Sequence, residues 1–140
     1  MKFSMVSALA CLAPIQSAAA KGINCDDSTL CGDQKGFLEK LTDIVTDNIN
    51  GVDPNYHFSN GEQIACAGHI GAFLQKASNG AWGQEVTGGI VKLRNHGCKA
   101  CGSYPFIDND VDKGELTVNY VTNNCGQGVC NDALNPKRPG

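Results

Sequence analysis

The distribution of cysteines constrains the fold of this chain more than any other sequence feature. Eight cysteines occur in 140 residues, and seven of them follow a segment with the pattern of a secretory signal. That segment has Lys2, an apolar run over residues 3–15 and small residues up to Ala20, so we expect cleavage after Ala20. Because exported chains pass through an oxidising compartment, the remaining cysteines are expected to form disulfides.

The odd number of exported cysteines predicts three disulfides and one leftover thiol. Counting alone leaves the connectivity open, because many pairings of seven cysteines satisfy it. The cysteines concerned are Cys25, Cys31, Cys66, Cys98, Cys101, Cys125 and Cys130.

The composition fits one packed domain without attraction to polyanions. The chain is 41% hydrophobic with a formal net charge of -3, which disfavours disorder and gives no positive field for nucleic acid or anionic lipid. The apolar run of the signal is shorter than the ~18 residues of a membrane span. We therefore expect a secreted, extracellular protein without nucleic-acid partner or membrane insertion. The expected parts are a signal peptide (1–20), a domain (21–125) and a flexible Gly- and Pro-containing tail (126–140).

Apolar periodicity predicts two helices. Residues 35–50 place a continuous apolar stripe on one helical face, with Asp33 expected to cap the start and Gly51 to follow the end. Residues 84–96 have a similar apolar arc and stop before Gly97, although the pair Gly88–Gly89 weakens the helical propensity.

Alternation of apolar and polar residues predicts one clear strand over residues 115–121. Shorter strands are expected at residues 23–25, 63–67, 70–74 and 98–101. Turn-forming pairs such as Asn60–Gly61 separate them, which favours antiparallel pairing.

The spacing Cys98-Lys99-Ala100-Cys101 is shared by dithiol oxidoreductases and zinc sites. Reactive cysteines of the first kind lie at a helix N-terminus, whereas Gly97 places this pair after a helix C-terminus. A zinc site of Cys25, Cys31, Cys98 and Cys101 has suitable ligands, but secretion favours structural disulfides. We expect no metal and no cofactor.

Neither a calcium loop nor a catalytic cluster is clearly encoded. Residues 108–114 have carboxylates at alternate positions, but Lys113 stands where a calcium loop needs glycine, so we expect a turn. His57, His69 and His96 are the general-base candidates, and a secreted ribonuclease would combine one with Glu and Arg. His96 next to a helix end fits a structural role better. We expect no catalytic residues and no enzyme.

Two segments resemble the killer protein four family, secreted toxins of smut-fungus viruses with fungal chromosomal homologues. The longer segment starts at Asn95-His96-Gly97-Cys98-Lys99-Ala100-Cys101-Gly102-Ser103 and continues through residues 109–111 and 114–121. The shorter one is Gly22-Ile23-Asn24-Cys25 with Cys31-Gly32. The resemblance covers residues 22–125 and implies an α+β fold, a disulfide-stapled α/β sandwich whose antiparallel sheet has two helices on one face.

The resemblance also implies a disulfide pairing. It joins Cys25 to Cys98, Cys31 to Cys101 and Cys66 to Cys125, and it leaves Cys130 unpaired. The chain is then expected to be a monomer, and a free Cys130 allows a disulfide-linked dimer.

The activity implied by the resemblance is growth inhibition of competing fungal or plant cells through a cell-surface target such as a calcium channel. The family's lysine linked to activity lies two residues before Cys66, where this chain has Ile64. Lys76, Lys92, Lys99 and Lys113 offer other positive contacts, and no target-binding residue is singled out. The alternatives are a small secreted hydrolase, such as a ribonuclease, and a non-toxic cell-wall or host-interaction effector on the same scaffold.

Overall fold

The computed structural model describes residues 21–26, 28–130 and 133. The signal peptide expected at residues 1–20, and most of the end of the expected tail, lie outside the described residues. The helical elements are η2 (Thr29–Asp33), α2 (Phe37–Thr46), α3 (Gly83–His96) and η3 (Val111–Lys113). The strands are β1 (His57–Phe58), β2 (Gln63–Ala67), β3 (Ile70–Gln75), β4 (Ala81–Trp82), β5 (Gly102–Pro105), β6 (Glu115–Tyr120) and β7 (Gly128–Val129).

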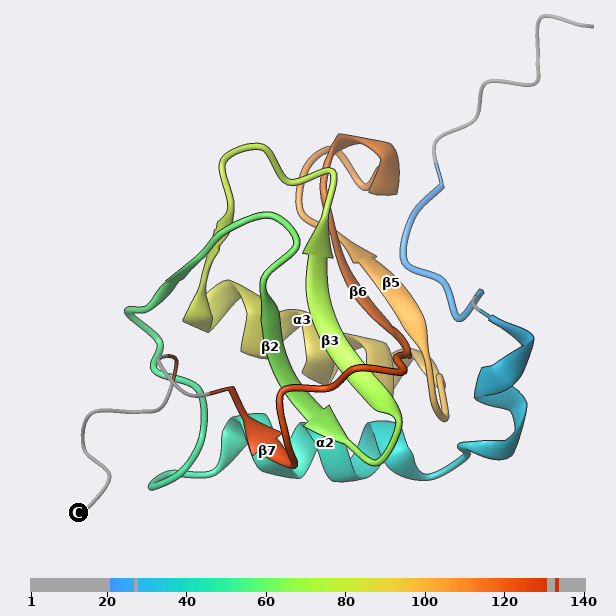
Figure 1. Cartoon of the computed structure of the whole chain (residues 1–140). Helices are drawn as coiled ribbons and strands as arrows, with labels where there is room; N and C mark the ends of the chain where they lie inside the picture. Colours follow the sequence, from blue (N-terminus) through green and yellow to red (C-terminus); the bar gives the residue numbers. More distant parts are fainter. Residues whose placement is uncertain (1–20, 27, 131–132, 134–140) are drawn as a thin grey trace, which may run out of the picture.

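Five strands form one antiparallel sheet in the order β5-β6-β3-β2-β7, and β1 pairs with β4 in a small second sheet (Figure 1). Helices α2 and α3 pack on each other and cover one face of the large sheet, α2 over β2, β3 and β7 and α3 over β5 and β6. This is the α+β fold that the resemblance implies. No helix in the described part of the chain is long and apolar enough to cross a membrane.

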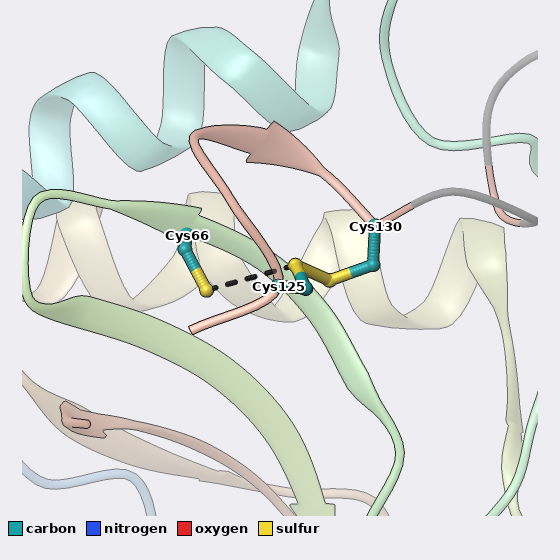
Figure 2. A group of neighbouring side chains, drawn as sticks. All are labelled: Cys66, Cys125 and Cys130. Carbon is teal, nitrogen blue, oxygen red and sulfur yellow. Dashed lines mark hydrogen bonds between the residues drawn. A yellow bond between two sulfur atoms is a disulfide. The ribbon is translucent and has the colours of Figure 1, made fainter. Parts of the chain in front are cut away.

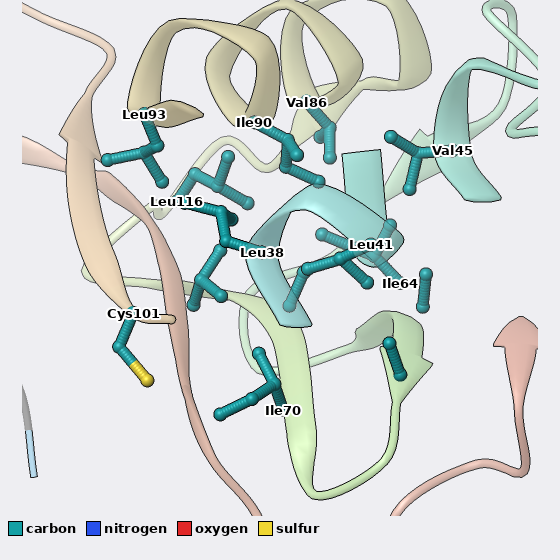
Figure 3. Close-up of a cluster of buried hydrophobic side chains, with 14 of the residues drawn as sticks. Leu38, Leu41, Val45, Ile64, Ile70, Val86, Ile90, Leu93, Cys101 and Leu116 are labelled. Atoms are coloured by element: carbon teal, nitrogen blue, oxygen red, sulfur yellow. The ribbon is translucent and has the colours of Figure 1, made fainter. Parts of the chain in front are cut away.

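The core lies between the two helices and the sheet (Figure 3). The apolar stripes of both helices meet alternate residues of β3 and β6, as the two-residue period of a strand requires. The fully buried side chains of this layer include Leu38, Leu41, Val86, Ile90, Leu93, Ile64, Ile70, Leu74, Leu116 and Val118.

Helix α2 is shorter at both ends than residues 35–50. Gly36 precedes it with a φ of 94°, and the expected cap residue Asp33 instead ends η2. At the other end, Asp47 is extended, and its carboxylate accepts hydrogen bonds from the backbone N–H groups of Ile49 (2.8 Å) and Asn50 (2.6 Å). These side-chain bonds replace the next helical turn, so the helix stops at Thr46.

Helix α3 begins one residue before the predicted range and ends where predicted. Gly97 adopts a φ of 104°, and its N–H bonds the carbonyls of Arg94 and Leu93. Gly89 faces β5 and β6, where a Cβ would lie 2.8 Å from Tyr104 Cδ2. The close approach of helix and sheet therefore requires glycine at position 89.

The strand predicted at residues 98–101 is wrong, because β5 begins at Gly102. The backbone of this segment forms hydrogen bonds with the two helices and not with a strand. The N–H of Cys98 donates to the carbonyl of Leu93, and the carbonyl of Lys99 accepts from the N–H groups of Gly36 (3.1 Å) and Leu38 (3.3 Å). The segment closes α3 and caps the start of α2. Of residues 23–25, Asn24 alone forms a bridge, with Ser103. The predictions at residues 63–67, 70–74 and 115–121 are confirmed by β2, β3 and β6.

The expected flexible tail also needs correction. Gly128 and Val129 form β7 on the edge of β2, and the N–H of Cys130 bonds the carbonyl of Ile64 (2.8 Å). Ala133 is 2% exposed, and its carbonyl accepts from Asp53 (2.8 Å). The described residues after Cys125 therefore belong to the domain, because β2 offers them an unpaired strand edge.

Candidate functional site

Two disulfides hold the N-terminal segment against the end of α3. Cys25 joins Cys98 and Cys31 joins Cys101, with Cα–Cα distances of 5.3 and 6.2 Å, and these are two pairs that the resemblance implies. Hydrogen bonds between Asn24 and Ser103 extend the contact along the edge of β5. The segment preceding η2 is thereby fixed to the sheet without entering it.

The Cys98–Cys101 motif is structural in this arrangement. Each cysteine is bonded to a distant partner, and they are only 4% and 1% exposed. The motif follows Gly97 at the C-terminus of α3, where the helix dipole disfavours a thiolate. The same four sulfur atoms that a zinc site would need are used in two bonds.

The third disulfide differs from the implied pairing. Cys125 is joined to Cys130, and Cys66 remains a free, buried thiol. This corrects both the expected Cys66–Cys125 bond and the expected unpaired Cys130. Because Gly126 and Gly128 both have a φ of 106°, the chain turns back sharply enough to bring Cys130 beside Cys125. Cys125 and Cys130 are five residues apart in the sequence, and two glycines lie between them. This pattern was the sequence signal for the bond.

The unbonded Cys66 nevertheless lies against the bonded pair (Figure 2). Its Sγ atom is 3.8 Å from Cys125 Sγ, and the three sulfur atoms lie within 4.8 Å of one another. Burial raises the pKa of the Cys66 thiol, and a hydrogen bond from the Cys125 backbone partly opposes this. Among the described residues, this is the one group of three His, Cys, Asp or Glu side chains close enough to share a metal ion.

The three histidines belong to separate parts of the surface. His57 packs edge-on against Trp82 at a centroid distance of 4.6 Å, and His69 stacks on Tyr120 at 5.0 Å. His96 ends α3. The fold therefore does not bring the three histidines together in one site.

The carboxylates of residues 108–114 are held apart by lysines. Asp108 accepts from Lys113 (2.8 Å) and Asp112 from Lys76 (2.9 Å), while Asp110 caps the N–H of Asp112 (3.0 Å). Each carboxylate thus accepts a hydrogen bond from a different donor. The segment contains the short helical turn η3, in agreement with the turn that was predicted in place of a calcium loop.

A groove of about 580 Å³ lies where α3 ends beside β5. Its lining combines exposed Lys92 and His96 with the rings of Tyr104 and Phe106. Lys92 Nζ lies 5.5 Å from the centre of the Tyr104 ring and 3.3 Å from its hydroxyl. Unlike Lys76 and Lys113, Lys92 forms no salt bridge with any residue that the structure describes, so the groove has a cation beside aromatic surface.

Ile64 is fully buried in the core, next to an irregularity in the pairing of β2 with β3. The resemblance implies a lysine linked to activity at this position. In this chain the position faces the interior, so Ile64 offers no surface to a target. Lys99, by contrast, is exposed and lines a small pocket of about 160 Å³ with Lys35, over the Cys31–Cys101 bond.

Comparison with known proteins agrees with this framework. The Kp4 family model matches residues 8–122. The KP4 killer toxin of the Ustilago maydis P4 virus is 35% identical over 129 residues, which span 88% of this chain and 94% of the viral protein. The chain therefore belongs to the Kp4 family.

Proposed function

We propose that this protein is a secreted, killer-toxin-like inhibitor of fungal or plant cell growth that acts by binding a cell-surface protein. The observation that carries the proposal is the match to the KP4 killer toxin over nearly the whole chain, together with the two long-range disulfides of the matched segments. Interference with calcium channels of the target cell is the mode of action that the family resemblance implies.

A binding mechanism agrees with the distribution of reactive side chains. The histidines lie apart, and four of the cysteines are used in disulfides that fix the surface. Such a surface inhibits a channel by complementary contact, for which rigidity lowers the entropic cost of binding.

The groove beside α3 is the contact surface that we propose for the target. Tyrosine is enriched among the residues that dominate protein interfaces, and this groove places Tyr104 and Phe106 beside the charged end of Lys92. A negative net charge provides no long-range attraction to an anionic membrane, so recognition depends on local contacts of this kind.

The decisive experiment adds purified mature protein to fungal cultures and plant seedlings, with and without excess calcium. Growth inhibition that calcium relieves supports the proposal. Lys92→Glu is expected to weaken inhibition at least about tenfold, as loss of an interface contact of about 1.4 kcal/mol would. Lys40→Glu, on the exposed side of α2, is the matched control and should retain activity.

A hydrolase would behave differently in the same assay. Degradation of RNA or cell-wall polymer, unaffected by calcium and abolished in a folded His96→Ala protein, would overturn the binding mechanism. A folded protein that inhibits none of the organisms would favour the non-toxic effector.

A further inference from the structure

The cluster of Cys66, Cys125 and Cys130 has the composition of a thiol–disulfide exchange site. A free thiol lies 3.8 Å from one sulfur of an existing disulfide, and all three sulfur atoms lie within 4.8 Å of one another. A disulfide bond is about 2 Å long, so the sulfur atoms of Cys66 and Cys125 must approach each other by roughly 2 Å. A change of side-chain rotamer can supply a movement of this size. Figure 2 shows the Cys66 sulfur directed at Cys125, with the Cys130 sulfur beyond it.

We propose that this cluster is an exchange site that holds the domain in two alternative disulfide arrangements. The Cys66 thiol passes its proton to Cys130 Sγ, which lies within 4.8 Å of it, and the Cys66 thiolate attacks Cys125 Sγ. The Cys66–Cys125 bond forms as the Cys125–Cys130 bond breaks, and the electron pair leaves on Cys130, which takes up that proton. One disulfide and one thiol are present before and after, so the step needs no oxidant or reductant.

The surroundings allow the exchange without unfolding. Cys66 is anchored in β2 and fully buried, whereas Cys125 is exposed and Cys130 half-buried at the edge of the sheet. Because in-line attack requires the leaving sulfur to point away from Cys66, the Cys130 side chain rotates outward. The bonds of Gln127 to Gly68 and the pairing of Gly128 with Cys66 hold the loop on β2 meanwhile.

The exchange changes which thiol solvent can reach. In the arrangement of Figure 2 the free thiol is the inaccessible Cys66. In the alternative arrangement it is Cys130, half-buried at the edge of the sheet, where it can bond a thiol of a second molecule. The site thus converts a protected thiol into a reactive one without change in oxidation state.

Alkylation under native conditions tests the proposal. The mature protein is incubated at neutral pH with excess N-ethylmaleimide, without denaturant, then acidified and mapped by non-reducing mass spectrometry. Because alkylation is irreversible, we expect it to accumulate one label per molecule on Cys130, together with a Cys66–Cys125 bond. Label on Cys66, or no label after several days, would overturn the proposal.

Two variants sharpen the result. Cys66→Ser removes the attacking thiol, so native labelling should disappear while the Cys125–Cys130 bond remains. Cys130→Ser, treated with oxidised glutathione as the two-electron oxidant, should form the Cys66–Cys125 bond and release two reduced glutathione molecules. A folded Cys130→Ser protein that keeps both thiols free would contradict the exchange, and the wild-type labelling decides the case if this variant does not fold.

Discussion

The Cα atoms of Cys31 and Cys101 lie 6.2 Å apart although 70 residues separate them in sequence. The Cys25–Cys98 bond spans a separation of 73 residues between the same two segments. The two disulfide loops are therefore interleaved: once either bond has formed, the other closes only the short ring made by residues 25–31 and 98–101. Their contributions to stability should not add independently.

Removal of these bonds tests whether their contributions to stability depend on each other. In the loop-entropy model, replacing one pair by serine lowers the free energy of unfolding by about 3 kcal/mol, because the remaining bond keeps the ring short. Replacing both pairs opens the long loop as well and should cost about 7 kcal/mol in total. Urea unfolding of the two double variants and the quadruple variant measures this. If the quadruple variant lost no more free energy of unfolding than twice the loss of one double variant, the shared short ring of the interleaved bonds would be contradicted.

Sequence patterns predicted the elements whose signals are local. The period of residues 84–96 and the stop at Gly97 gave α3, and alternation gave β6. The ends of α2 depend on the left-handed Gly36 and on side-chain bonds from Asp47, which apolar periodicity does not report.

Long-range features were less accessible to sequence reasoning. Strand β7 has only Gly128 and Val129, and a two-residue strand exists because β2 offers an edge, which no local pattern indicates. Its formation also brings Cys130 to Cys125 and changes the expected third disulfide. Likewise, the groove beside α3 joins residues of the helix and β5 that only the fold brings together.

Introducing a lysine at position 64 tests the burial of Ile64. Ile64→Lys puts a charge into the fully buried core, so we expect the free energy of unfolding to fall by about 3–5 kcal/mol. Ile64→Val, which removes one methylene group, should cost about 1 kcal/mol. Urea midpoints compare the two. Equal midpoints, or a gain of toxicity by a fully stable Ile64→Lys protein, would show that this position reaches the surface.

The ion pair of Lys76 with Asp112 predicts a pH dependence of stability. The hydrogen bond from Lys76, followed by the attraction of its charge, lowers the pKa of Asp112 below its ordinary value. A lowered folded-state pKa stabilises the native protein above the unfolded pKa of about 3.9, and this contribution is lost as pH falls through the folded value. Asp112→Asn should therefore lower Tm slightly at pH values above about 5, and this difference should shrink as the pH falls through the lowered folded-state pKa of Asp112. Asp43→Asn, at an exposed site on α2, is the control. A Tm difference that persists unchanged in acid would exclude this linkage.

The glycine pair in α3 gives the sharpest test of how the helix meets the sheet. A Cβ at Gly88 would meet no atom within 4 Å, whereas a Cβ at Gly89 would lie 2.8 Å from Tyr104 and 2.9 Å from Leu116. Gly88→Ala should therefore raise the free energy of unfolding by up to about 1 kcal/mol, since alanine loses less backbone entropy in a helix. Gly89→Ala gains the same propensity but pushes α3 away from β5 and β6, and overpacking of this kind costs about 1–3 kcal/mol.

The two variants change the same atoms at neighbouring positions of one helix, so helical propensity cancels between them. The difference between their free energies of unfolding isolates the contact of α3 with Tyr104 and Leu116. Because Tyr104 also lines the groove, Gly89→Ala should weaken growth inhibition as well, while Gly88→Ala leaves it unchanged. Equal stabilisation by both substitutions would mean that the helix lies farther from the sheet than the structure places it.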